Sequence, residues 1–237
     1  MSRPEGKVLA SPRAIHYSAN MLFRLTLAPL LLAMPPALAC SVGPPYRVPN
    51  TQQLAQAADL IVLARVEGAT RKGLASTAIL KPTMLLKGTA LPSRLTLEGW
   101  MQGTVIENYT LPAPTRSNPA ELVEPNDDAL MGGCTRYIFA RGMTLLVFYK
   151  REKGQWRFMN YPFARVSEDV PSGNSRWVRA VREHIAIARL PAAARRPAMR
   201  KRADELARGN VDERAIARDM RRLLATKGAL DPIARPR

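Results

Sequence analysis

Apolar runs of strand length alternate with polar breaks through the middle of the chain. Residues 59–66 (DLIVLARV) form a β-branched run that ends before Gly68 and follows a polar, helix-compatible stretch. Residues 76–88 and 93–100 contain two further runs of strand length. Pro82 predicts an edge position or a bulge in the first of these two, because proline cannot donate a ladder hydrogen bond. The pattern predicts a β meander.

A hairpin, a long loop and a helix complete this part of the pattern. Residues 143–150 (MTLLVFYK) and 155–161 (QWRFMNY) flank a short turn and form the clearest hairpin in the sequence. Residues 110–133 contain four prolines and little periodicity, which predicts a long surface loop. Residues 172–189 predict a helix, and the apolar face that would pack on the sheet consists of Trp177, Val181, Ile185 and Ala188. Short strands with a terminal helix predict a mainly β fold built on a small barrel.

The N-terminal pattern is typical of an export signal. Residues 21–39 combine Arg24, an apolar run and the small-residue cleavage pattern Ala-Leu-Ala. Cleavage there would leave Cys40 as the first residue of an exported, periplasmic or secreted protein. Residues 1–20 show no apolar period, so we interpret them as a non-translated or disordered leader, with translation starting at Met21.

Two alternatives for this segment stay open. A membrane anchor would need roughly 20 apolar residues, and the uninterrupted apolar run is shorter than that. A loose lipoprotein box would place an acyl group on Cys40 and anchor the protein to a membrane.

The two cysteines of the chain, Cys40 and Cys134, predict one disulfide. Export places the chain where disulfides persist, and each cysteine is then the only intramolecular partner of the other. Closing a loop of this size stabilises a fold by about 4.7 kcal/mol on the chain-entropy model. Two unpaired buried thiols are the alternative if the chain is not exported.

The chain is strongly basic. Its 36 Lys and Arg residues against 19 Asp and Glu residues give a net charge of +17, which predicts attraction to polyanions such as nucleic acid, anionic lipid or acidic cell-envelope polymers. Residues 40–190 are expected to form the domain, and residues 191–237 form an Ala/Arg-rich extension with two modest helices broken near Gly209 and Asn210. We interpret this extension as a solvated helical tail, or alternatively as an arm that binds a polyanion or a membrane surface.

The sequence offers no evident catalytic centre. Its two histidines, His16 and His184, come without a Cys-x-x-Cys or His-x-x-x-His spacing for zinc. His184 is expected at the boundary of the core, and a thiol dyad with Cys134 is conceivable only without the disulfide. Asp127 and Asp128 lack the spacing of a calcium loop and are expected to form a solvated turn. We therefore expect no enzyme activity, no cofactor and no bound metal.

Residues 134–148 (CTRYIFARGMTLLVF) resemble the cysteine, aromatic, turn glycine and apolar strand of netrin-like modules and of the tissue inhibitors of metalloproteinases. The N-terminal Cys40, the Ala-Asp pair at 58–59 and the Leu-Leu-Lys-Gly sequence at 85–88 are similar as well. The resemblance covers residues 40–165 and implies a five-stranded oligonucleotide/oligosaccharide-binding (OB) barrel with a packed helix. It also implies that the N-terminal cysteine is bonded to the cysteine before the final hairpin.

The inhibitors begin Cys-x-Cys, whereas Cys40, Ser41 and Val42 allow one disulfide at most, as in exported bacterial-type members of the superfamily. We therefore expect an exported, non-enzymatic interaction module that binds an unidentified protein partner. The resemblance also implies an alternative, a metalloprotease inhibitor in which the α-amino group and carbonyl of Cys40 chelate the protease zinc and Ser41 provides a small neighbouring side chain.

A third hypothesis is a polyanion or nucleic-acid binder. Export argues against nucleic acid, and aromatic residues in strands more often belong to the core than to a stacking surface. The aromatic residues available for stacking are Tyr109, Tyr137, Phe148, Trp156 and Phe158.

Overall fold

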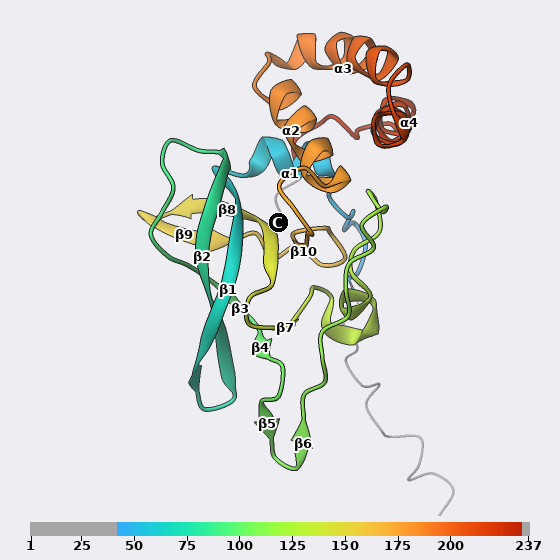
Figure 1. The fold of residues 1–237 in the computed structure, drawn as a ribbon. Helices are drawn as coiled ribbons and strands as arrows, with labels where there is room; N and C mark the ends of the chain where they lie inside the picture. Colours follow the sequence, from blue (N-terminus) through green and yellow to red (C-terminus); the bar gives the residue numbers. More distant parts are fainter. Residues whose placement is uncertain (1–41, 234–237) are drawn as a thin grey trace, which may run out of the picture. The chain divides into compact units, whose positions relative to one another are not determined.

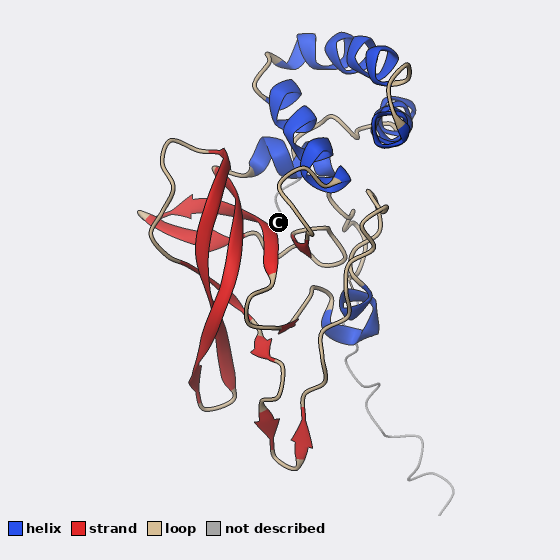
Figure 2. Cartoon of the chain, in the orientation of Figure 1, coloured by secondary structure: helices blue, strands red, loops and turns tan. Residues whose placement is uncertain are grey.

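A six-stranded antiparallel sheet is the main element of the structure, a computed structural model that describes residues 42–233. The strand order is β10-β8-β1-β2-β3, and β9 also pairs with β8 (Figures 1 and 2). The strands of this sheet are β1 (Leu60–Lys72), β2 (Ala75–Lys87), β3 (Leu95–Glu98), β8 (Thr144–Glu152), β9 (Gln155–Phe158) and β10 (Ser167–Asp169). Two small sheets pair β4 (Trp100–Met101) with β7 (Ile138–Phe139) and β5 (Val105–Ile106) with β6 (Tyr109–Thr110).

Helices make up the rest of the regular structure, so the fold is mixed α and β rather than mainly β. They are α1 (Thr51–Ala57), α2 (Arg176–Ala188), α3 (Ala192–Leu206), α4 (Val211–Ala225) and the short π-helix η2 (Ala129–Gly133). Asn50 caps the N-terminus of α1 and Asn210 caps that of α4, and the side chain of each accepts a hydrogen bond from a backbone N–H of the first turn in a capping box. The predicted break near Asn210 between two C-terminal helices is confirmed.

Strands β1 and β8 are buried on both faces. Leu60 and Val62 of β1 belong to a cluster on one face of the sheet, and Ile61 and Leu63 belong to a second cluster on the other. β8 alternates in the same way, because side chains along a strand point to opposite faces. The second cluster also contains the buried apolar residues of the helices. The sheet therefore separates two hydrophobic cores.

The predicted strands are present, with differences in their bounds. β1 continues to Lys72 instead of ending before Gly68, because Glu67 forms a bulge between Val66 and Gly68 and Gly68 then pairs opposite Ile79. Pro82 lies beside a second register shift, beyond the part of β2 that pairs with β3. The bulge predicted at Pro82 is confirmed.

The sheet curls without closing into the predicted five-stranded barrel. The hydroxyl of Tyr149 in β8 donates to the carbonyl of Thr96 in β3 at 3.0 Å, so distant strands of the sheet approach each other. Among residues 42–233, however, no strand pair closes the circle. The chain turns away from β3 at Gly99, where φ is 152° and a side-chain Cβ would clash with the Phe139 ring. It then continues as β4, which pairs with β7.

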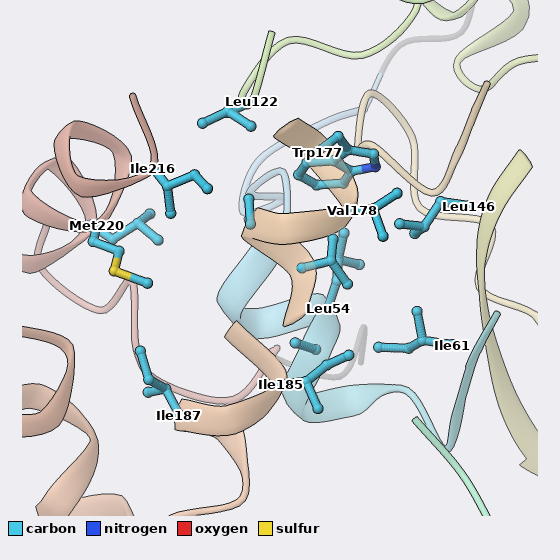
Figure 3. Packing of buried hydrophobic residues seen from close by; sticks show 14 of the residues in the cluster. Leu54, Ile61, Leu122, Leu146, Trp177, Val178, Ile185, Ile187, Ile216 and Met220 are labelled. Atoms are coloured by element: carbon cyan, nitrogen blue, oxygen red, sulfur yellow. The ribbon is translucent and has the colours of Figure 1, made fainter. Parts of the chain in front are cut away.

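The C-terminal extension is not a solvated tail, because α3 and α4 are part of the second core. Met199 is fully buried in the cluster that contains Trp177. Ile216 and Met220 of α4 are almost fully or fully buried in the same cluster (Figure 3). Buried residues lie on more than one side of α2, so a sheet alone could not cover this helix. The extension supplies the missing cover, which the amphipathic pattern of residues 172–189 alone did not reveal.

Ion pairs join the same helices at the edge of the core. Arg176 pairs with Asp212 at 2.8 Å, and Arg179 pairs with Glu213 at 2.8 Å, which links α2 to the first turn of α4. Arg202 of α3 pairs with Glu183 of α2 at 2.7 Å. The acidic residues at the start of α4 also lie where the helix dipole favours negative charge.

We predict that Met220→Ala lowers the free energy of unfolding by about 2–5 kcal/mol, because it leaves a cavity in the helix-covered core. Chemical denaturation measures this loss. Val211→Ala, on the exposed side of the same helix, is the control and should change stability by less than about 0.5 kcal/mol. Equal stability of the Met220 variant and the wild type would show that α4 does not pack on the domain.

Candidate functional site

A pocket of about 250 Å³ opens between the segment that precedes α1 and the loop that precedes η2. Its wall is mostly apolar, with two arginines and one glutamate among the lining residues. These residues are Val48, Pro49, Asn50, Thr51, Leu54, Leu122, Val123, Glu124, Pro125, Leu130, Phe163, Arg165 and Arg222. The pocket therefore combines apolar surface with a few charged groups, as ligand and partner sites commonly do.

Four large apolar side chains at this pocket are exposed. Val48 is 48% exposed, Val123 42%, Leu130 55% and the adjacent Met131 75%. We call these four residues the apolar rim. Exposed apolar side chains are ordinary when they are scattered, but a group of them beside a pocket is typical of an interaction surface.

Cys134 lies directly after the rim and is itself buried. It follows η2 in a left-handed conformation with φ of 57°, and its carbonyl accepts a hydrogen bond from the Phe163 backbone N–H at 2.5 Å. The loop is thereby joined to the wall of the pocket. Cys40 and Ser41 lie outside the described residues, so the disulfide and the protease-zinc contact stay predictions, as do the export signal and the leader.

Arg165 forms a fixed charge at the base of the pocket. Its guanidinium donates to the Glu124 carbonyl at 2.5 Å and lies over the Trp177 ring at 4.6 Å. Burial lowers the pKa of Arg165 from its ordinary value, while the carboxylate of Glu168, 3.7 Å away, opposes the shift. Arginine remains charged under such shifts, so the pocket base keeps a cation held against an aromatic ring.

The loop predicted over residues 110–133 is held by buried polar side chains. The Ser117 hydroxyl donates to Glu168 Oε2 at 2.6 Å, and the Asn126 backbone N–H donates to Glu168 Oε1 at 3.1 Å. The Asn126 amide donates to the Thr115 carbonyl at 2.9 Å. These hydrogen bonds attach the buried side of the loop to β10, and the apolar-rim residues of the loop face solvent.

A buried ion pair strengthens this attachment. Arg136 Nη1 donates to Asp169 Oδ1 at 2.6 Å, and the two side chains are 1% and 12% exposed. Burial alone would raise the pKa of Asp169, but Arg136 and the hydrogen bonds from Ser117 outweigh burial and hold the pKa below its ordinary value. The carboxylate is therefore stabilised in its charged form in the folded protein.

The hydroxyl of Ser117 is committed to this network. It donates its proton to Glu168 and accepts hydrogen bonds from Arg136 Nη1 at 3.2 Å and from the Asp169 backbone N–H at 3.2 Å. A nucleophilic serine needs a base and an approach for substrate, and this buried hydroxyl has neither a free lone pair nor access. Its geometry serves loop attachment.

His184 is fully buried instead of lying at the boundary of the core. Its Nδ1 lies 3.0 Å from Gln52 Oε1 of α1, and its Nε2 faces Asp219 Oδ2 of α4 at 3.4 Å, a long contact. The sequence predicted His184 nearer to the surface than it lies, because α4 was not expected to cover α2. Both ring nitrogens face these two residues, so the dyad conceived with Cys134 is not formed.

Asp219 is the acidic member of a buried polar group that also contains Gln52, His184 and Arg222. It accepts a hydrogen bond from Arg222 at 2.6 Å in addition to the His184 contact. Burial would raise the pKa of Asp219, but His184 and Arg222 together hold it below the ordinary value. This polar group thus joins α1, α2 and α4 through His184, and no charge pattern in the sequence indicated that Gln52 and Asp219 lie on either side of this histidine.

The remaining predicted residues are not brought together into a site. Asp127 is exposed as expected, but Asp128 is buried at the start of η2, where its N–H donates to Asn126 Oδ1 at 3.0 Å. Phe148 lies in the core whereas Tyr109 is exposed on β6, so they do not share a stacking surface.

The described part of the chain offers neither a metal-binding cluster nor a membrane-spanning helix. Between residues 42 and 233, no group of three or more His, Cys, Asp and Glu side chains is arranged to hold a metal ion. No helix in that range has the length and apolar character needed to cross a membrane.

Comparison with protein-family models and with curated protein sequences gives no relative from which a role could be transferred. No protein-family model matches the chain, and no curated protein sequence matches it significantly. The apolar rim and its charged base are therefore interpreted from their geometry.

We predict that Asp169→Asn lowers the free energy of unfolding at pH 7 by about 3 kcal/mol, because it leaves Arg136 buried without its partner charge. The depressed pKa means that Asp169 stabilises the fold above the ordinary aspartate pKa of about 3.9, and that this contribution is lost as the pH falls through the lower folded-state pKa. The variant should therefore have a flatter stability profile between about pH 4 and pH 2.

Denaturant titrations at a series of pH values measure both effects. Asp127→Asn removes an exposed acidic group from the same loop and serves as the control, with an expected change below about 0.5 kcal/mol at pH 7. Parallel pH profiles of Asp169→Asn and wild type would contradict the role given to the Arg136–Asp169 pair.

Proposed function

We propose that the protein is an exported, non-enzymatic interaction module that binds a protein partner at the apolar rim. The observation that carries the proposal is the exposure of Leu130 and Met131 beside an apolar pocket, on a loop whose base is held by buried charges. Rigid attachment reduces the ordering cost of binding, and exposed apolar side chains supply area that a partner can bury.

We also propose that the sheet is an open variant of the OB barrel of netrin-like modules. Three features support this assignment: β1 pairs with both β2 and β8, the sheet curls until Tyr149 reaches Thr96, and Gly142 makes the turn before β8 with φ of 83°. In this interpretation β4 and β7 replace the hydrogen bonds that close a regular barrel.

A second candidate function is inhibition of a zinc protease. The feature that favours it is the position of the rim on the chain: Met131 is three residues before Cys134, the predicted partner of Cys40. If the predicted disulfide forms, the α-amino group of Cys40 is held near the rim. A neutral amine can then bind a metal, and the rim supplies the surrounding contact surface that a single chelating residue lacks.

We predict that a photo-reactive residue at Met131 captures a discrete partner in intact cells. Met131→p-benzoylphenylalanine should give one adduct on denaturing gels after irradiation, and mass spectrometry identifies it. Leu74→p-benzoylphenylalanine is the matched control, because Leu74 is 74% exposed at the tip of the β1–β2 hairpin, whereas Met131 is 75% exposed next to Leu130 of the pocket. Adding Leu130→Asp to the Met131 probe should abolish the adduct.

The controls distinguish specific binding at the apolar rim from nonspecific crosslinking. Identical adducts from positions 74 and 131, or an adduct that survives Leu130→Asp, would contradict binding at the rim. A folded Met131 probe that gives no adduct in cells that produce the protein in its native compartment would also contradict the proposal.

We further predict that, if the second function holds, protein starting at Cys40 inhibits a zinc endopeptidase and protein extended by one N-terminal alanine does not. The extension moves the α-amino group away from the metal and leaves the remaining surface intact. Residual protease activity against a peptide substrate measures inhibition. Equal inhibition by both forms, or none by either, would restrict Cys40 to its predicted structural role.

A further inference from the structure

The acidic side chains of α3 and α4 are all used in ion pairs. Residues 192–225 contain five of them, and each pairs with an arginine or histidine of α2, α3 or α4: Asp204, Glu205, Asp212, Glu213 and Asp219. Three of these pairs join α4 to α2 and thus hold the helices on the core. The other two, Asp204 and Glu205, pair with arginines at the surface of α3 and α4, so every carboxylate of this segment has a cationic partner.

The basic side chains of the same helices mostly face solvent. We define the basic face by six exposed residues: Arg200, Lys201, Arg208, Arg214, Arg218 and Arg221. Arg221 of α4 pairs with Asp204 of α3 at 2.9 Å, so the exposed sides of the two helices adjoin. Among residues 42–233, no carboxylate lies within ion-pair distance of the other five.

The geometry of the two helices argues against a lipid surface. A helix that lies in a membrane interface inserts an apolar side, and the apolar sides of α3 and α4 are already buried against α2 and the sheet. Val211 is the only large apolar residue of the two helices that is exposed in the described chain. Binding through this face therefore depends on charge without insertion.

The composition of the same face argues against recognition of nucleobases. Residues 192–225 contain no Phe, Tyr or Trp, so they offer no aromatic ring on which a base could stack. Five of the six side chains are arginines, whose planar guanidinium groups bind sulfate, carboxylate and phosphate groups in a bidentate manner. Along α4, Arg214 and Arg218 are about 6 Å apart on the helix axis, so successive charges of one polymer chain can be contacted.

We propose that the basic face of α3 and α4 is a binding surface for a linear anionic polysaccharide. It shares no residue with the apolar rim and differs from it in chemistry, although Arg218 and Val123 of the rim line one shallow pocket where the two surfaces adjoin. The fold makes the surface selective for charge: ion pairs within and between the helices neutralise the acidic groups, and packing buries the apolar side.

The test compares two folded variants with the same loss of charge. The first carries Arg200→Gln, Lys201→Gln, Arg208→Gln, Arg214→Gln and Arg218→Gln, which keeps the Arg221–Asp204 pair and replaces each basic residue with a good helix former. The control variant replaces five exposed basic residues of the sheet and its loops with glutamine: Lys72, Lys81, Arg94, Lys153 and Arg157. Both variants should match the wild type in circular dichroism and in unfolding free energy.

Heparin is the probe, and its affinity is measured at several salt concentrations. The first variant should bind about 10- to 100-fold more weakly and show a flatter dependence on salt, because each lost contact removes counterion release. The control variant should lose less than about threefold, because it changes only the net charge. Equal losses in the two variants would show that overall charge, not this face, attracts the polymer.

Two further probes decide the class of ligand. Single-stranded DNA and vesicles that contain one-third anionic lipid are titrated under the same salt conditions. Weaker binding of both than of heparin supports the proposal. Tighter binding of the DNA or of the vesicles, with the loss again confined to the first variant, would overturn it in favour of that ligand.

Discussion

Burial of both faces of β1 and β8 is the constraint on which the rest of the structure depends. A strand with one polar face can border solvent, but Leu60 to Ala64 of β1 are all buried, so both faces of the sheet must be covered. One face is covered by the curl of the sheet itself, with Tyr149 reaching Thr96. The other is covered by α1 and α2, and α2 in turn requires α3 and α4. Helices α3 and α4 are thus needed to complete the cover over strands β1 and β8, which lie much earlier in the sequence.

This covering arrangement also determines where the charges lie. Two clusters of charge are buried beside the second core, the Arg136–Asp169 pair under the loop and Asp219 between His184 and Arg222. Removing one member of such a pair costs more than the pair itself contributes, because the remaining charge is left desolvated. Basic residues that have no buried acidic partner must lie on the surface of the protein, where water solvates their charge. The high net charge of the chain is therefore concentrated on surfaces that packing does not use.

Local patterns in the sequence predicted the individual elements well and their assembly poorly. The runs at 76–88 and 143–150 became β2 and β8 because hydrophobic period and turn chemistry are local properties. The closed barrel and the solvated tail were wrong for a common reason: each depends on which distant surface covers an apolar face. The apolar face predicted for residues 172–189 described one side of α2 and left the side covered by Met220 unassigned. At the candidate site, Cys134 was identified in advance, whereas the anchoring roles of Ser117 and Glu168 carried no local signal.

The loop over residues 110–133 shows how the fold keeps apolar side chains exposed without losing stability. Its fixed points are polar: Ser117 and Asn126 bind Glu168 beneath the loop, and Arg165 holds the Glu124 carbonyl. None of these bonds involves the side chain of Leu130 or Met131. Substitutions at the rim therefore leave the attachment of the loop intact, whereas substitutions at its base loosen the whole surface. A rim separated in this way from the residues that hold it can change its binding preference while the fold stays the same.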